Sequence, residues 1–240
     1  MDDTGWTGGP LLGFDTETTG VDVHTDRIVT AAVVVRTPRT TEVLTWMIDP
    51  GVEIPAEAAA IHGVSTEHAR AHGRPPREAL EEIAAVLARH AREGVPVVAY
   101  NAAFDLTLLD AELARHGLPT LPDRLGRPVA PVLDPLVIDR WQDRFRRGKR
   151  RLGDLCELYG ITGEGDLHSA DVDVLATLDV LEAQVLRFPD LRAVALDALH
   201  LAQRDAHQAW AENFNAWRAL QGLPGPGAST AWPVEPRAAG

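Results

Sequence analysis

The amino-acid sequence predicts an α/β protein in which a mixed β-sheet, an antiparallel meander plus parallel strands, is flanked by helices. Three strand-like segments, residues 11–20, 27–36 and 42–49, follow one another with short connections, which favours an antiparallel meander. Further along the chain, apolar segments at 96–100 and 129–133 alternate with helical patterns, which is typical of parallel strands joined by helices. Together these two observations place helices against a mixed sheet.

The first strand is the element on which the rest of the prediction depends. Its apolar residues run up to Phe14 and end in Asp15 and Glu17, before a stop at Gly20. Side chains two residues apart in a strand point to the same side, so the two carboxylates are expected to converge. Two such like charges repel each other unless a proton or cation lies between them, and oxygen ligands favour Mg²⁺ or Mn²⁺.

The helices are predicted from apolar spacing, N-caps and stop signals. Ser65 is a good N-cap, a proline pair precedes one long amphipathic segment, and Gly117 and Gly160 are natural stops. The expected helical ranges are 56–61, 77–93, 106–116, 135–145 and 151–159, with further helices expected after the N-caps Ser65 and Ser169, the latter ending before Pro189.

Four ranges describe the expected organisation of the chain. Residues 1–10 are glycine-rich and expected to be flexible, and residues 11–188 form the principal domain. Residues 189–221 are expected to form a helical extension whose aromatic residues pack on the domain or on a partner. Residues 222–240, rich in glycine, proline and alanine, are expected to be disordered.

Composition excludes several classes of protein. The chain has 240 residues, enough for one substantial core, and its single cysteine, Cys156, excludes an internal disulfide framework and a cysteine-based zinc site. A net charge of −12 argues against coating nucleic acid by charge alone. Without a long apolar run or the basic start of a signal peptide, a cytoplasmic location with no membrane association is expected.

The chemistry-bearing residues lie in three separate segments. Asp15 and Glu17 belong to the first strand, Asp105 follows the strand at 96–100, and His168 and Asp173 flank the predicted start of a helix. Four carboxylates and one imidazole are the groups required for two-metal hydrolysis of a phosphodiester, with histidine suited to accept the proton of the attacking water.

These segments resemble the three motifs of the DEDDh 3′→5′ exonucleases, which include the proofreading epsilon subunits of bacterial DNA polymerase III. The matching stretches read FDTETTG at 14–20, NAAFD at 101–105 and HSADVD at 168–173. The resemblance spans residues 11–188 and implies the ribonuclease H-like fold. The order of the motifs, with a histidine five residues before the last aspartate, makes the resemblance specific.

The resemblance also implies roles for individual residues. Asp15, Glu17, Asp105 and Asp173 would hold two Mg²⁺ or Mn²⁺ ions, and His168 would be the general base. The residues implied to contact the substrate, a DNA 3′ end, are Thr16, Thr18, His62, Asn101, Phe104, Lys149 and Arg150. The two basic residues belong to the dense basic run at 144–151, for which a solvated surface loop is the alternative.

Three functional alternatives stay open from the sequence. The motifs do not distinguish DNA from RNA, because discrimination depends on contacts to the 2′ position. A binding subunit with a vestigial site would have lost at least one of the five chemical positions, and all are present. The C-terminal extension allows a polymerase or another partner, but no sliding-clamp-binding motif follows the domain.

Overall fold

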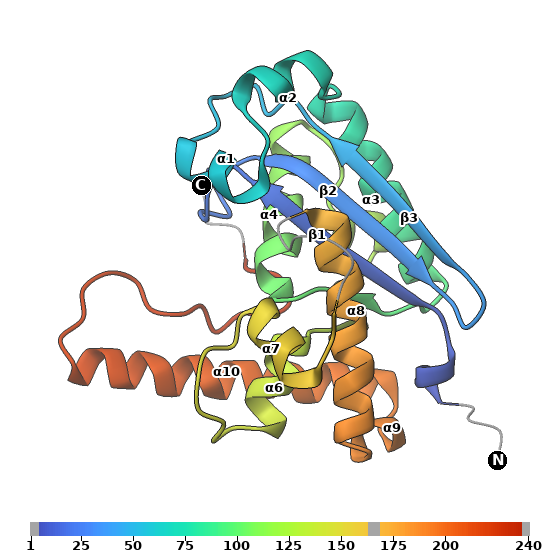
Figure 1. The fold of residues 1–240 in the computed structure, drawn as a ribbon, viewed down its shortest axis with the longest axis vertical. Coiled ribbons are helices and arrows are strands. Elements are labelled where there is room, and N and C mark those ends of the chain that lie inside the picture. Colours follow the sequence, from blue (N-terminus) through green and yellow to red (C-terminus); the bar gives the residue numbers. More distant parts are fainter. Residues whose placement is uncertain (1–4, 163–168, 237–240) are drawn as a thin grey trace.

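The computed structural model describes residues 5–162 and 169–236 as a five-stranded mixed sheet with helices on both faces (Figure 1). The strand order is β3-β2-β1-β4-β5. The strands are β1 (Leu11–Thr18), β2 (Ile28–Arg36), β3 (Thr41–Met47), β4 (Val97–Val98) and β5 (Val132–Leu133). The predicted fold class is therefore confirmed, with the acidic strand β1 at the centre of the sheet.

The strand pairing confirms both predicted parts of the sheet, the antiparallel meander and the parallel strands. β1 pairs antiparallel with β2, with Asp15 opposite Ala32, and β2 pairs antiparallel with β3. β4 runs parallel to β1 and to β5. The carboxyl ends of β1 and β4 therefore lie at the same edge of the sheet, which is where the first two motifs occur.

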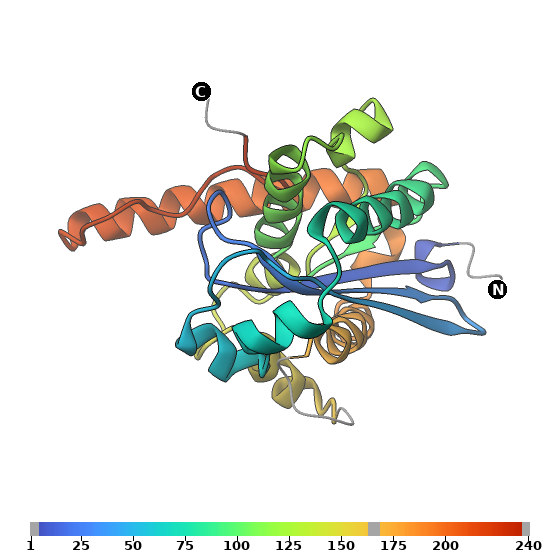
Figure 2. The same ribbon diagram turned by 90° about the horizontal axis from the view of Figure 1, so that it is seen from above.

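The helices cover the sheet in two layers, as Figures 1 and 2 show. α3 and α4 bury one face together with Leu12 and Phe14 of β1, whereas α8 buries the other face together with Leu11. The helices are α1 (Ala56–His62), α2 (Thr66–His72), α3 (Pro76–Arg92), α4 (Ala102–Arg115), α5 (Leu121–Leu125), α6 (Pro135–Gln142), α7 (Leu152–Tyr159), α8 (Ala170–Arg187), α9 (Asp190–Ala193) and α10 (Leu196–Leu220).

Alternation along β1 decides which helix each functional residue faces. Leu11 packs with the α8 layer, and Leu12 and Phe14 pack with the α3 and α4 layer. By the two-residue period, Asp15 and Glu17 continue the α8 face, and Thr16 continues the α4 face. The first strand thus presents its acids to one helix and a threonine to the other.

Glycine in the middle of β1 brings α8 close to the strand. A Cβ atom on Gly13 would collide with Cγ1 of Val174 and lie 3.2 Å from Cδ1 of Leu178. Both of these residues are fully buried in α8. The missing side chain therefore sets the depth at which the α8 backbone, and with it Asp173, packs against the sheet.

Both ends of the chain differ from the sequence-based expectation where the structure describes them. Trp6 lies in a short 3₁₀ helix, η1 (Trp6–Gly8), and its indole donates to the carbonyl of Leu191 at 3.3 Å, so residues 5–10 are not a flexible lead-in. Trp232 is 5% exposed, so the C-terminal segment that was expected to be disordered packs on the domain around this residue. An aromatic side chain that finds a buried place can order a segment of otherwise loop-forming composition.

Several boundaries also differ. The expected extension at 189–221 is two helices, because Val194 is extended and separates α9 from α10. The helix expected to begin at residue 106 begins at Ala102, so Asp105 lies within its first turn. Within the described ranges, none of the helices combines the length and apolarity that crossing a membrane requires.

Candidate active site

Three of the predicted carboxylates converge where β1 meets α8. Asp15, Glu17 and Asp173 each offer an oxygen, and these oxygens lie within 4.8 Å of one another. Asp15 and Glu17 come from the α8 face of β1, and Asp173 comes from the first turn of α8. All three side chains are partly buried, so they can share a ligand that still exchanges with solvent.

The fourth carboxylate reaches the site from the opposite face of the sheet. Asp105 is 3% exposed, and its Oδ1 accepts hydrogen bonds from the backbone N–H of Thr16 at 3.1 Å and from the Thr16 hydroxyl at 2.7 Å. Thr16 is the residue of β1 that faces α4, which explains the pairing. Asp105 lies outside the three-residue cluster, but its charge still raises the pKa of Asp15.

Burial and mutual repulsion hold these acids toward their protonated forms when no cation is present. Burial, then the charges of Asp105, Asp173 and Glu17, raise the pKa of Asp15 well above its ordinary value. Burial and the charge of Asp173 raise the pKa of Glu17 to about 7, and burial raises that of Asp105 to about 7 against the opposing hydrogen bonds from Thr16. Such a cluster is stabilised by positive charge.

The donor set fits a hard divalent cation. All of the converging groups are carboxylates, the ligands that Mg²⁺ and Mn²⁺ prefer, and none is the cysteine or histidine that zinc favours. The elevated pKa values show that the polypeptide alone leaves the repulsion within the cluster uncompensated. These residues therefore fit the metal site that the sequence predicts.

A buried carboxylate that was not anticipated from the sequence holds the second motif in place. Asp134, 1% exposed, accepts hydrogen bonds from the backbone N–H groups of Asn101 and Ala102 at 3.0 and 2.9 Å. It also caps α6 by accepting from the N–H of Leu136. The signal that could have revealed it is an aspartate directly before Pro135 at a predicted helix start.

Asn101 makes the sharp turn from β4 into α4. Its backbone is left-handed, with φ 62° and ψ 47°, a conformation that asparagine tolerates better than most residues with a side chain. Its side chain is exposed. This turn starts α4 at Ala102 and so places Asp105 one turn into the helix.

Three of the residues predicted to contact the substrate lie at the end of β1, at the end of α1 and in α4. Thr18 ends β1, and its hydroxyl donates to the carbonyl of Gly20 at 2.6 Å. His62 ends α1, where burial lowers its pKa and the backbone of Thr18 opposes that shift. Phe104 is half-buried and lines a cavity of about 260 Å³ together with Asn101.

The basic run is divided between structural and exposed residues. The guanidinium groups of Arg146 and Arg150 both pair with Asp139, which is fully buried, and Arg150 also donates to the carbonyls of Asp139 and Asp143. Arg150 therefore ties the loop to α6, which explains its place in the sequence without a substrate. Lys149 is exposed.

The predicted general base, His168, lies outside the described residues. The helix that follows begins at Ala170, with Asp173 in its first turn.

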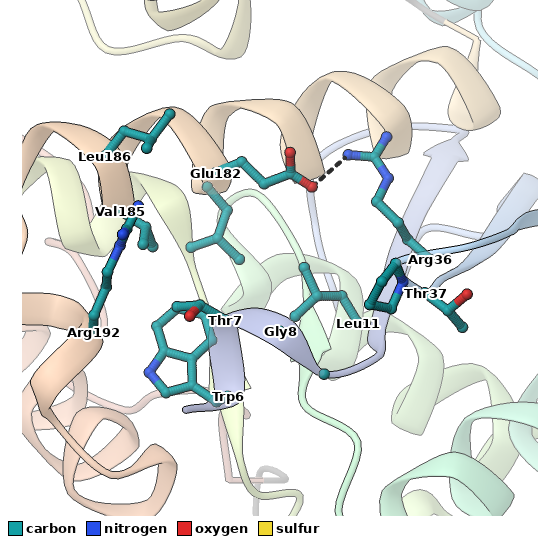
Figure 3. Close-up of a pocket in the computed structure, with 13 residues that line it drawn as sticks. Trp6, Thr7, Gly8, Leu11, Arg36, Thr37, Glu182, Val185, Leu186 and Arg192 are labelled. Atoms are coloured by element: carbon teal, nitrogen blue, oxygen red, sulfur yellow. Dashed lines mark hydrogen bonds and ion pairs between the residues drawn. The ribbon is translucent and has the colours of Figure 1, made fainter. Parts of the chain in front are cut away.

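Another cavity lies away from the acids. It has a volume of about 370 Å³ and is lined by Trp6, Leu11, Arg36, Glu182 and Leu186 among others (Figure 3). Trp6 belongs to η1, and the others belong to the start of β1, the end of β2 and the C-terminal half of α8, the ends opposite to those that carry Asp15 and Asp173. Arg36 pairs there with Glu182 at 3.1 Å.

Comparison with solved structures shows the same fold. Exonuclease I from Methylocaldum szegediense matches 76% of this chain and 42% of its own with a TM-score of 0.63 and 24% identity. Escherichia coli Exonuclease I, solved in complex with a dA16 oligonucleotide, matches 77% of this chain and 42% of its own with a TM-score of 0.66 and 20% identity.

Curated sequences include relatives at higher identity. The PolC-type DNA polymerase III of Streptococcus thermophilus is 31% identical over 167 residues, and that of Lactococcus lactis is 29% identical over 167 residues. Each match covers 68% of this chain, which spans only about a tenth of the length of these relatives.

A family model described as "Exonuclease" matches residues 12–181, which include all four carboxylates and His168. With more than half of its length matched, the chain belongs to the exonuclease family.

Proposed function

We propose that the chain is a two-metal-dependent 3′→5′ exonuclease that hydrolyses phosphodiester bonds at single-stranded or frayed DNA 3′ ends and releases nucleoside 5′-monophosphates. The observation that carries the proposal is the convergence of Asp15, Glu17 and Asp173 within 4.8 Å. Membership of the exonuclease family and the DNA oligonucleotide bound to a structural neighbour support the reaction class and the substrate.

The four carboxylates would divide two Mg²⁺ or Mn²⁺ ions among them. Asp15, Glu17 and Asp173 would hold one, and Asp105 together with Asp15 would hold the second. When bound, divalent ions at such a site stabilise the negative charge that develops on the phosphate oxygens. Thr16 keeps the Asp105 carboxylate oriented toward the site through its two hydrogen bonds.

The other residues would bind the substrate and move its proton. His168 would accept the proton of the attacking water, a role for which a near-neutral pKa is suited. Thr18, His62 and Phe104 would hold the terminal nucleotide, and the exposed Lys149 would contact a phosphate. The internal ion pairs of Arg150 already occupy its guanidinium, so we assign it no substrate contact.

The proposal is tested by digesting a 5′-labelled single-stranded DNA oligonucleotide with Mg²⁺, Mn²⁺ or chelator. Wild type should give a metal-dependent ladder that shortens from the 3′ end, and Asp15→Asn should give none. Asp197→Asn, which removes one exposed carboxylate from the first turn of α10, is the matched control and should be fully active. His168→Ala should be slower by roughly 10²- to 10⁴-fold.

Three results would contradict parts of the proposal. An intact oligonucleotide under every metal condition would overturn the activity, and near wild-type turnover by Asp15→Asn would overturn the metal site. Strong preference for a matched RNA oligonucleotide would overturn DNA as the substrate. For a proofreading or repair role, a mispaired 3′ end should be removed faster than a paired one, because its end frays more readily.

A further inference from the structure

A cavity beside the second motif extends the candidate active site toward the C-terminal helix. Its volume is about 260 Å³, and its walls include Asn101 just before α4, Phe104 of α4, Arg140 of α6, Trp210 of α10 and Glu235 of the tail. Phe104 directly precedes Asp105, so one end of the cavity adjoins the residues that would hold a terminal nucleotide. Figures 1 and 2 show α10 extending past the domain with the tail returning beside it.

Arg140 is the feature of this cavity that packing alone does not explain. Its guanidinium lies 3.6 Å from the centre of the Trp210 ring and is largely buried, and burial lowers its pKa. It makes no ion pair or hydrogen bond to any residue that the structure describes. The buried carboxylates of Asp134 and Asp139 lie in its vicinity and offset its charge, but five N–H groups donate to Asp134, and Arg146 and Arg150 pair with Asp139.

Stacking on an indole leaves the N–H edges of a guanidinium free to bind an anion. Arginine held in this way is suited to phosphate oxygens, which accept two parallel hydrogen bonds from its planar fork. The cavity therefore has a positively charged wall whose hydrogen-bonding capacity the described protein does not use.

The remaining walls suit the other parts of a nucleotide. Phe104 offers aromatic surface against which a base can stack, Trp210 already stacks with Arg140 and Phe214 and closes the wall beside it, and the Glu235 carboxylate can accept a hydrogen bond from a base amino group. A free anion would gain from Arg140 but would be repelled by Glu235. An arginine, aromatic rings and one carboxylate together fit a nucleotide better than they fit inorganic phosphate.

Aromatic rings continue outward from the cavity along α10. The Trp210 and Phe214 rings stack with centroids 5.4 Å apart, and the Phe214 and Trp217 rings with centroids 5.8 Å apart. Trp217 is 51% exposed. Stacked, partly exposed rings beside an arginine are a common platform for single-stranded nucleic acid, which they bind without regard to sequence.

We propose that this cavity is a subsite for the nucleotides that precede the 3′-terminal one in a single strand, with Arg140 binding the phosphate and Phe104 contacting the base. The inference rests on the proposed exonuclease function, and it assigns to α10 and the tail a direct part in holding the substrate. It predicts that substrates long enough to reach the cavity bind more tightly than a single nucleotide ester.

Two substrates separate this subsite from the catalytic centre. Thymidine 5′-(p-nitrophenyl phosphate) carries one nucleotide and does not reach the cavity, whereas a ten-residue single strand does. Arg140→Met should raise KM for the strand roughly 10- to 100-fold and leave kcat and hydrolysis of the ester unchanged. Arg140→Lys should recover only part of the lost affinity for the strand, because lysine keeps the positive charge but lacks the paired N–H donors of the planar guanidinium. Arg204→Met, on the exposed surface of α10, is the control and should match wild type.

Binding without cleavage provides an independent measurement. Asp15→Asn in chelator should bind a fluorescein-labelled strand, and adding Arg140→Met should weaken binding and lower the salt dependence of log Kd by about 0.7. Unchanged affinity in the double variant would overturn the subsite. An equal loss on the strand and the ester would also overturn it, since that result points to damage at the catalytic centre. If wild type cleaved neither substrate, the proposed function would fail, while this binding comparison would still decide the subsite.

Discussion

At the scale of one residue, Glu17 shows how repulsion between neighbouring carboxylates makes ionisation unfavourable in the candidate site. Burial and the charges of Asp173 and Asp105 raise its pKa from 4.5 to about 7. At pH values between 4.5 and about 7, Glu17 is protonated in the folded protein but ionised in the unfolded chain. Unfolding therefore becomes easier as pH rises through this window, and the metal-free protein should be less stable at pH 7.5 than at pH 5.

This fall of stability with rising pH leads to the first prediction. In chelator, the thermal midpoint should fall between pH 5 and pH 7.5, and Mg²⁺ or Mn²⁺ should raise it more at pH 7.5 than at pH 5, because the cation binds the ionised carboxylates. Glu17→Gln removes one titrating group and should flatten the pH dependence of the midpoint in chelator. Thermal denaturation monitored by circular dichroism measures the midpoint. A midpoint that rises from pH 5 to pH 7.5 would contradict the prediction that repulsion within the acidic cluster destabilises the metal-free protein.

At the scale of elements, the site depends on how closely α8 approaches β1. Asp173 reaches the strand acids because Gly13, two residues before Asp15, leaves room for Val174. The helix begins at Ala170, so Asp173 and Val174 occupy its first turns, where small displacements at the strand move the carboxylate directly.

The second prediction follows from this contact. Gly13→Ala places a methyl group against Cγ1 of Val174 and should destabilise the protein by roughly 1–3 kcal/mol, as overpacking does, with a loss of divalent metal affinity. Val174→Ala in the same chain removes the colliding methyl and should recover metal affinity relative to Gly13→Ala alone. Urea unfolding and metal titration of the four proteins of this cycle measure the coupling. Strictly additive effects would show that the contact does not position Asp173.

At the scale of the whole molecule, the C-terminal segment returns to support the second motif. The Trp232 ring packs on that of His200 in a tilted arrangement, with centroids 5.0 Å apart, and its indole N–H donates to Oδ2 of Asp134 at 3.3 Å. Gln203 of α10 accepts from the backbone N–H of Asp134 at 2.7 Å. Elements about 70 and 98 residues away in sequence thus fix the carboxylate that holds the N–H groups of Asn101 and Ala102.

The third prediction concerns the packing of Trp232 and the C-terminal segment on the domain. Trp232→Ala should cost roughly 3–5 kcal/mol of unfolding free energy through the cavity it leaves, and should lower nuclease activity by loosening the turn before α4. Trp232→Phe keeps most of the packing but loses the hydrogen bond, and should cost about 1 kcal/mol. Guanidinium unfolding alongside the oligonucleotide assay tests both. Wild-type stability in Trp232→Ala would show that the tail does not pack as described.

The sequence by itself determined the sheet topology and the identity of the acidic residues. Strand alternation, caps and the three motifs are local patterns with a physical period, so Asp15, Glu17, Asp105 and Asp173 could be named without coordinates. The same reasoning failed for the two ends of the chain. Glycine- and proline-rich composition describes an isolated segment, whereas Trp6 and Trp232 are ordered by surfaces formed elsewhere in the chain.

Only the tertiary structure decided which partners surround each charged residue. Arg140 and Arg150 are both arginines near one basic run, but Arg150 pairs with buried Asp139, and Arg140 stacks on Trp210 and faces a cavity. Asp134 likewise became recognisable as the support of the second motif only once its hydrogen bonds were seen. The physical reason is that a charge acquires its role from the partners that folding places around it, and those partners lie far away in the sequence.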